Sequence, residues 1–167
     1  MYDIDYFEGE GIPFILGETG KHLKKKASYI IKERPKEIQE VYNIINFIMN
    51  LVWEEGLLAL EENFHNFSES HIPQIDFFLN FILPVVDGVE RNILLEMIAN
   101  EFLVRKPSDF ELLVLFLYTI TILSVREWSH YDLLNHREEA RKALIEIKNK
   151  YLIFLPKECR EVFEFCK

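Results

Sequence analysis

The sequence predicts an all-α fold: a single bundle of about six helices preceded by an irregular N-terminal arm. Three observations support this prediction. Apolar residues recur at three- and four-residue steps along most of the chain, and no segment shows the two-residue alternation of a half-buried strand. The chain has 167 residues, of which 49% are hydrophobic and 14% aromatic, which is enough for the core of one domain. Prolines and cap-forming residues divide the pattern into helix-sized pieces.

The irregular arm is expected over residues 1–20, because this stretch contains four glycines and a proline. The single helical domain is expected over residues 21–167. Its first element is predicted to be a short basic helix over 21–33, which stops near Pro35 because proline disfavours helix for the residue before it.

A long helix is predicted from Pro35 to about Ser68, since proline is favoured in the first turn of a helix. Apolar residues recur at helical spacing throughout this stretch. Gly56 lies inside it, where glycine costs about 1 kcal/mol relative to alanine. We therefore expect another part of the protein to pack closely against Gly56.

The next two helices are predicted over 73–86 and 89–104. Asp87 and Gly88 separate them, and glycine there fits the left-handed conformation that commonly ends a helix. This pair is therefore interpreted as a turn.

Ser108 or Asp109 is expected to cap a helix that begins at Phe110 and runs to about Asn135. Its segment from Leu112 to Val125 has no charged residue. A membrane-spanning helix needs about 20 such residues, and this run is shorter. It is therefore predicted to be a buried core helix.

Two final helices are predicted over 137–150 and 156–166. The last one carries both cysteines, Cys159 and Cys166. Their spacing of two helical turns places them about 10 Å apart along the axis, which is too far for a disulfide. We expect free thiols, which are typical of a cytoplasmic protein.

The charge balance restricts the kinds of partner. The net charge is −9 and the isoelectric point is about 5.1. Nucleic acids and anionic membranes need a positive field, so neither is an expected partner. The one basic run, at 21–26, is short and is interpreted as a solvated helix face.

Two motifs stand in order along the chain: Gly-Leu-Leu-Ala-Leu-Glu at 56–61 and Val-Val-Asp-Gly at 85–88. Together they resemble the cytoplasmic loop of MotA, the flagellar stator subunit of the MotA/TolQ/ExbB proton-channel superfamily. The similarity covers about residues 36–104. It implies a non-enzymatic MotA-like domain, without the four membrane spans of that family, which acts by contact with a flagellar rotor or stator component.

The resemblance also implies which residues bind the partner. In the family, the glutamate that ends the first motif and an arginine eight residues earlier meet opposite charges on the rotor. Glu61 matches the glutamate, but Trp53 stands in place of the arginine. We therefore expect an acidic patch of Glu54, Glu55, Glu61 and Glu62, with Trp53 as an aromatic anchor if it is exposed.

Two alternatives remain open. Glu62-x-x-His65 and Glu127-x-x-His130 have the spacing that supplies ligands to the dinuclear metal centre of ferritin-like bundles. The chain could also be a generic helical scaffold. No phosphate loop or nucleophile elbow is present in the sequence, so neither enzymatic activity nor a cofactor is expected.

Overall fold

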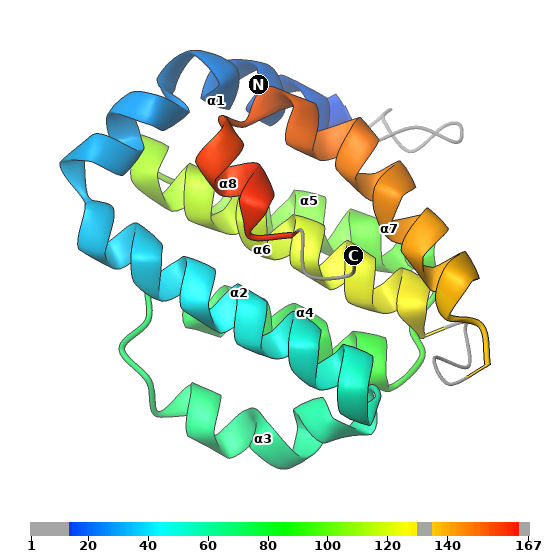
Figure 1. Cartoon of the computed structure of the whole chain (residues 1–167). Coiled ribbons are helices and arrows are strands. Elements are labelled where there is room, and N and C mark those ends of the chain that lie inside the picture. Colours follow the sequence, from blue (N-terminus) through cyan, green and yellow to red (C-terminus); the bar gives the residue numbers. More distant parts are fainter. Residues whose placement is uncertain (1–13, 130–134, 164–167) are drawn as a thin grey trace.

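The computed structural model describes residues 14–129 and 135–163. These residues form helices and no strand, so the all-α prediction is confirmed (Figure 1). The elements in chain order are α1 (Phe14–Glu33), α2 (Pro35–Glu55), α3 (Leu58–Ser68), α4 (Ile75–Val86), α5 (Arg91–Arg105), α6 (Asp109–Trp128), α7 (Arg137–Tyr151), the 3₁₀-helix η2 (Leu152–Phe154) and α8 (Lys157–Glu161).

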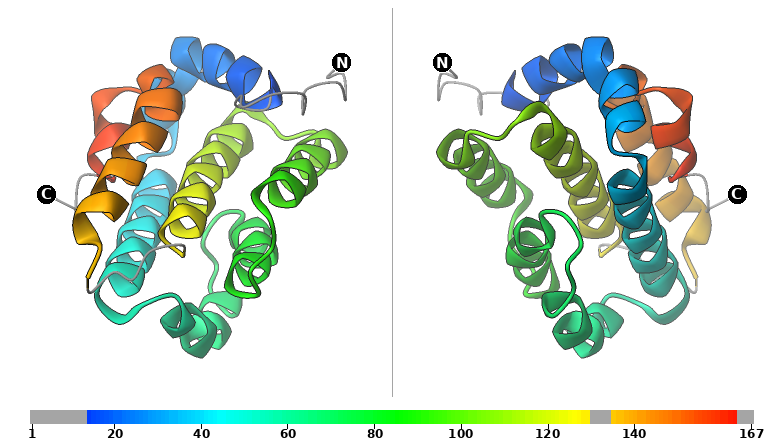
Figure 2. Two further views of the ribbon diagram at one scale, coloured as in Figure 1. Left: turned by 90° about the vertical axis from the view of Figure 1, so that its right-hand side faces the viewer. Right: turned by 90° about the vertical axis from the view of Figure 1, so that its left-hand side faces the viewer.

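Helix α6 is the centre of the fold. Helices α1, α2, α4 and α7 all contact it, and Figure 2 shows it enclosed between them. Every residue from Leu113 to Val125 is buried, so this helix has no polar face. A helix that is apolar all round is stable only inside a protein core or a membrane. The predicted core helix over 112–125 is therefore confirmed.

The few polar groups inside α6 are satisfied within the protein. The hydroxyls of Thr119, Thr121 and Ser124 donate to the carbonyl oxygen four residues earlier, at 2.8, 2.9 and 2.7 Å. The Tyr118 hydroxyl donates to the carbonyl of Pro73 at 2.8 Å. Buried polar groups without such partners would be costly, and here each is bonded. None of the described helices is long and apolar enough to cross a membrane.

Several helix ends follow the local sequence signals. Pro35 occupies the first turn of α2, as expected. The Ser108 side chain caps α6 by accepting a hydrogen bond from the backbone N–H of Glu111 at 3.3 Å. Asp87 ends α4, and Gly88 follows with a φ of +82°. The predicted turn at Asp87 and Gly88 is confirmed.

The irregular arm predicted over residues 1–20 is wrong for residues 14–20, and residues 1–13 lie outside the described part of the chain. Helix α1 begins at Phe14, so residues 14–20 are helical rather than irregular. A Cβ on Gly20 would lie 2.4 Å from Cδ2 of Phe154, on η2. Gly20 thus lets α1 and η2 approach closely, and glycine serves packing here rather than a turn.

The long helix expected from Pro35 to Ser68 is two helices. Helix α2 ends at Glu55 and α3 begins at Leu58. Between them Gly56 has φ +91° and ψ 174°, a conformation that only glycine adopts readily. No atom lies within 4 Å of the position of a Cβ on Gly56, so the expected close packing contact at this residue was wrong.

Two further boundaries differ from the prediction. Helix α6 ends at Trp128 rather than near Asn135, because Ser129 already caps it. Helix α8 ends at Glu161 rather than at 166, and residues 164–167 lie outside the described part of the chain.

Gly56→Ala is expected to lower the free energy of unfolding by about 1–3 kcal/mol, through backbone strain alone. Urea denaturation followed by far-ultraviolet circular dichroism measures this change. In a continuous helix the same substitution would raise stability by about 1 kcal/mol. The sign of the change therefore decides between a broken and a continuous helix.

Candidate functional site

Helix α2 meets α3 at Gly56 (Figure 1). An exposed acidic surface lies at this break. Four glutamates lie on it, and all are exposed. We call this surface the acidic corner; it consists of Glu54, Glu55, Glu61 and Glu62. Because the last turn of α2 and the first turns of α3 supply these residues, the predicted acidic patch depends on the sharp turn between the two helices.

The charges of the acidic corner are largely available to a partner. Glu54 has a distant ion pair, with 3.9 Å between its Oε2 and Nη2 of Arg137. Glu55, Glu61 and Glu62 have no ion pair with any cation that the structure describes. Glu61 lies in the first turn of α3, where a negative charge also favours the helix dipole.

An exposed leucine lies among these acids. Leu58 is 68% exposed, and it shares a helix face with Glu61 and Glu62, which follow it by three and four residues. The sequence did not single out Leu58, because a continuous helix directs attention to the apolar stripe through Leu57 and Leu60. The signal that could have revealed the exposure of Leu58 was Gly56, if it had been interpreted as the end of a helix.

Trp53 is not part of this surface, and its predicted role as an exposed anchor was wrong. It is 6% exposed, and its ring centroid lies 5.1 Å from that of Trp128. The guanidinium groups of Arg137 and Arg141, on α7, lie 5.0 and 5.6 Å from the Trp53 ring. Helix α7 therefore covers Trp53, which belongs to the core.

The remaining motif residues are structural. Gly56 forms the α2–α3 connection, and Asp87 and Gly88 form the α4–α5 connection. A Cβ added to either glycine would have no atom within 4 Å, so both are needed for backbone conformation alone.

Three of the four alternative metal ligands, Glu62, His65 and Glu127, are described by the structure, and it does not bring these three together. Glu62 and His65 are both exposed on α3, where His65 Nε2 lies 3.2 Å from Oε1 of Glu69. Glu127 lies on α6, and His130 is outside the described residues. Within residues 14–129 and 135–163, no group of three His, Cys, Asp or Glu residues could hold a metal ion.

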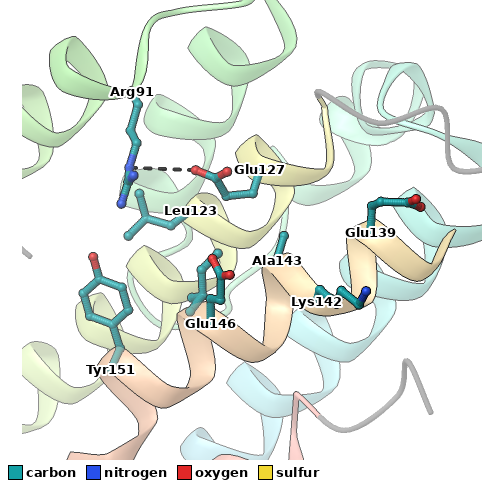
Figure 3. A pocket seen from close by; sticks show the side chains of 9 residues that line it. Arg91, Leu123, Glu127, Glu139, Lys142, Ala143, Glu146 and Tyr151 are labelled. Carbon is teal, nitrogen blue, oxygen red and sulfur yellow. Dashed lines mark ion pairs between the residues drawn. The ribbon is translucent and has the colours of Figure 1, made fainter. Parts of the chain in front are cut away.

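Glu127 instead lines a cavity of about 240 Å³ between α5, α6 and α7, which we call the α5–α7 cavity (Figure 3). Its carboxylate lies 3.8 Å from Nε of Arg91 and 3.9 Å from Nη1 of Arg126. No motif links the residues that line this cavity, because three helices contribute them. Those residues are Arg91, Leu123, Glu127, Glu139, Lys142, Ala143, Glu146, Ile147 and Tyr151.

Cys159 is a free, buried thiol, as expected from the sequence. Its Sγ lies 3.1 Å from the hydroxyl of Tyr42. Burial raises the pKa of Cys159 to about 11, although the hydrogen bond between Cys159 and Tyr42 acts in the opposite direction. The thiolate is thus scarce at neutral pH, and this cysteine is unsuited to nucleophilic chemistry. Cys166 lies outside the described residues.

The resemblance to MotA stays a prediction that depends on the two motifs. Comparison of the chain with protein-family models, with curated proteins and with solved structures gives no match, so the family is identified by none of the three.

Proposed function

We propose that this chain is a non-enzymatic, MotA-like cytoplasmic domain that binds a basic surface of a flagellar rotor or stator component through its acidic corner. One observation carries the proposal: exposed carboxylates without ion pairs to any described cation surround an exposed leucine at a single corner of the fold. Such a surface combines charge for orientation with an apolar group that gains from burial.

The energetics require several of these groups to act together. An exposed ion pair contributes only about 0.2–1 kcal/mol. Full burial of a leucine side chain adds about 1.5–3 kcal/mol. Leu58 with two or three carboxylates is thus sufficient for a weak, reversible contact. The net charge of −9 would further accelerate the approach of a basic partner.

The buried position of Trp53 defines what the partner surface must look like. The resemblance implies a basic residue at this position, whereas this chain has a tryptophan that α7 covers. Positive charge at this point comes from α7 instead: the Arg137 and Arg141 guanidinium groups lie over the Trp53 ring, and Arg137 Nη2 is 3.9 Å from Oε2 of Glu54. The partner surface that complements Glu55, Leu58, Glu61 and Glu62 is basic around an apolar pocket.

The variant Glu55→Gln/Glu61→Gln/Glu62→Gln is expected to bind such a partner about 3- to 100-fold more weakly, because it loses three exposed ion pairs. Isothermal titration against the purified rotor protein, at low and at high salt, measures this loss. The wild-type affinity should fall with salt, and the affinity of the variant should respond much less.

A matched control removes three exposed carboxylates elsewhere: Glu40→Gln/Glu96→Gln/Glu158→Gln. It changes the net charge equally and should retain most of the wild-type affinity. Equal losses in both variants would mean that only the overall charge matters. The absence of binding by the wild-type chain would reject the flagellar partner.

A further inference from the structure

The α5–α7 cavity contains two buried hydrogen-bond donors whose protons no described residue accepts. Tyr151 is 1% exposed, and its hydroxyl donates to no described residue; the Arg91 guanidinium, itself a donor, lies close to the hydroxyl oxygen. Nε of Arg91 is also buried and donates no hydrogen bond to a described residue. Figure 3 shows the Tyr151 hydroxyl pointing from α7 toward the Arg91 guanidinium, across the cavity. Buried polar groups are nearly always bonded, so these two indicate that something polar occupies the space.

Both groups are hydrogen-bond donors at neutral pH. Burial raises the pKa of Tyr151, and this effect outweighs the charge and the hydrogen-bonding proximity of Arg91, which act in the opposite direction. The phenol therefore keeps its proton, and arginine is always charged. One wall of the cavity thus presents two O–H or N–H donors to the same space, which suits an oxygen acceptor such as a carboxylate.

Carboxylates lie beside these donors. Oε1 of Glu127 is 3.8 Å from Nε of Arg91, and Glu146 lines the same cavity from α7. Figure 3 shows Glu146 near the middle of the cavity and Glu139 directed away from it. A cation that enters between Glu127 and Glu146 would be close to an anion held by Arg91 and Tyr151.

Leu123, Ala143 and Ile147, from α6 and α7, form an apolar part of the lining. Lys142 also lines the cavity, and Figure 3 shows its amino end directed away from Arg91 and Tyr151. The volume of about 240 Å³ is below the roughly 300–1,000 Å³ of pockets for drug-sized ligands. The cavity therefore suits a small molecule with an apolar portion and with opposite charges close together.

We propose that the α5–α7 cavity binds a small apolar α-amino acid. The carboxylate of the ligand accepts hydrogen bonds from Arg91 and Tyr151, and its ammonium group faces Glu127 and Glu146. Its side chain packs on the apolar lining. An α-amino acid fits because it carries both charges close to one carbon, whereas a diamine or a dicarboxylic acid complements only one wall.

The proposal is tested by titrating the full chain with leucine, valine and isoleucine and following binding by isothermal calorimetry and by ligand-observed nuclear magnetic resonance. We expect saturable binding with a Kd of about 1 mM or tighter. Leucinamide lacks the carboxylate and 4-methylpentanoate lacks the ammonium group, so both should bind at least about tenfold more weakly. If none of leucine, valine and isoleucine binds, the proposal is overturned and the cavity holds only water.

Tyr151→Phe removes one hydroxyl and should weaken leucine binding about tenfold or more, without lowering the thermal stability of the free protein. Tyr29→Phe is the matched control, because Tyr29 is 65% exposed on α1 and does not line the cavity. Glu146→Gln, at an exposed position, provides a second test on the ammonium side. Unchanged affinity in both Tyr151→Phe and Glu146→Gln would overturn the assignment. Because none of these residues belongs to the acidic corner, the result is independent of the partner titration.

Discussion

Leu117→Lys is expected to abolish cooperative folding at neutral pH, with a loss of more than about 4 kcal/mol in the free energy of unfolding. Leu117 is fully buried in α6, and helices cover this helix on several sides. A lysine there loses the hydration of its ammonium group without gaining a partner. Chemical denaturation followed by circular dichroism measures the loss.

The pH dependence of this variant follows from the same burial. Desolvation lowers the pKa of a buried lysine below its unfolded value of about 10.4. The unfolded state then binds more protons than the folded state, so stability should rise between pH 7 and pH 10. Val104→Lys is the control: Val104 is 75% exposed on α5, and its change should stay within about 0.5 kcal/mol. Similar losses at both positions would contradict the central place of α6.

Trp128→Ala is expected to cost about 3–5 kcal/mol of unfolding free energy. Trp128 is 1% exposed at the end of α6, and its indole Nε1 donates to the carbonyl of Ala140 on α7 at 3.1 Å. It also packs against Trp53. The substitution would thus remove contacts that hold α7 on α2 and α6.

Trp128→Phe separates the two contributions of this side chain. It keeps much of the apolar volume and loses the indole hydrogen bond, so we expect a smaller loss of about 1–3 kcal/mol. Urea denaturation of both variants gives the comparison. A loss below about 1 kcal/mol for Trp128→Ala would mean that α7 is anchored by other residues.

Local signals predicted much of the fold. Pro35, Ser108 and Gly88 each act on the backbone of their own turn, so their roles can be read from neighbouring residues. The uncharged run over 112–125 predicted a buried helix, because no other location in a globular protein suits it.

Tertiary contacts decided what the sequence could not predict. The sequence does not distinguish the roles of Gly20 and Gly56. Gly20 allows Phe154 to approach α1, whereas Gly56 ends α2. Trp53 is buried because Arg137 and Arg141, far along the chain, lie on its ring. The sequence around Trp53 therefore contains no signal for the residues that cover it.

The same distinction applies to the candidate sites. The acidic corner comes from one stretch of sequence, and the residues predicted for it lie together except for Trp53. The α5–α7 cavity combines Arg91, Glu127 and Tyr151 from three helices. Only the packing of those helices brings their donors and carboxylates together, so no spacing rule could identify it.

The central place of α6 has a consequence during synthesis. Helices α1, α2 and α4 precede it in the chain and contact it in the fold. At a translation rate of about 5–20 residues per second, about 2–8 s separate the completion of α4 from that of α6. Until the ribosome releases residues 109–128, the earlier helices lack the surface on which they pack. The nascent chain thus exposes apolar side chains during this interval, and a fragment that ends before α6 should bind chaperones rather than fold.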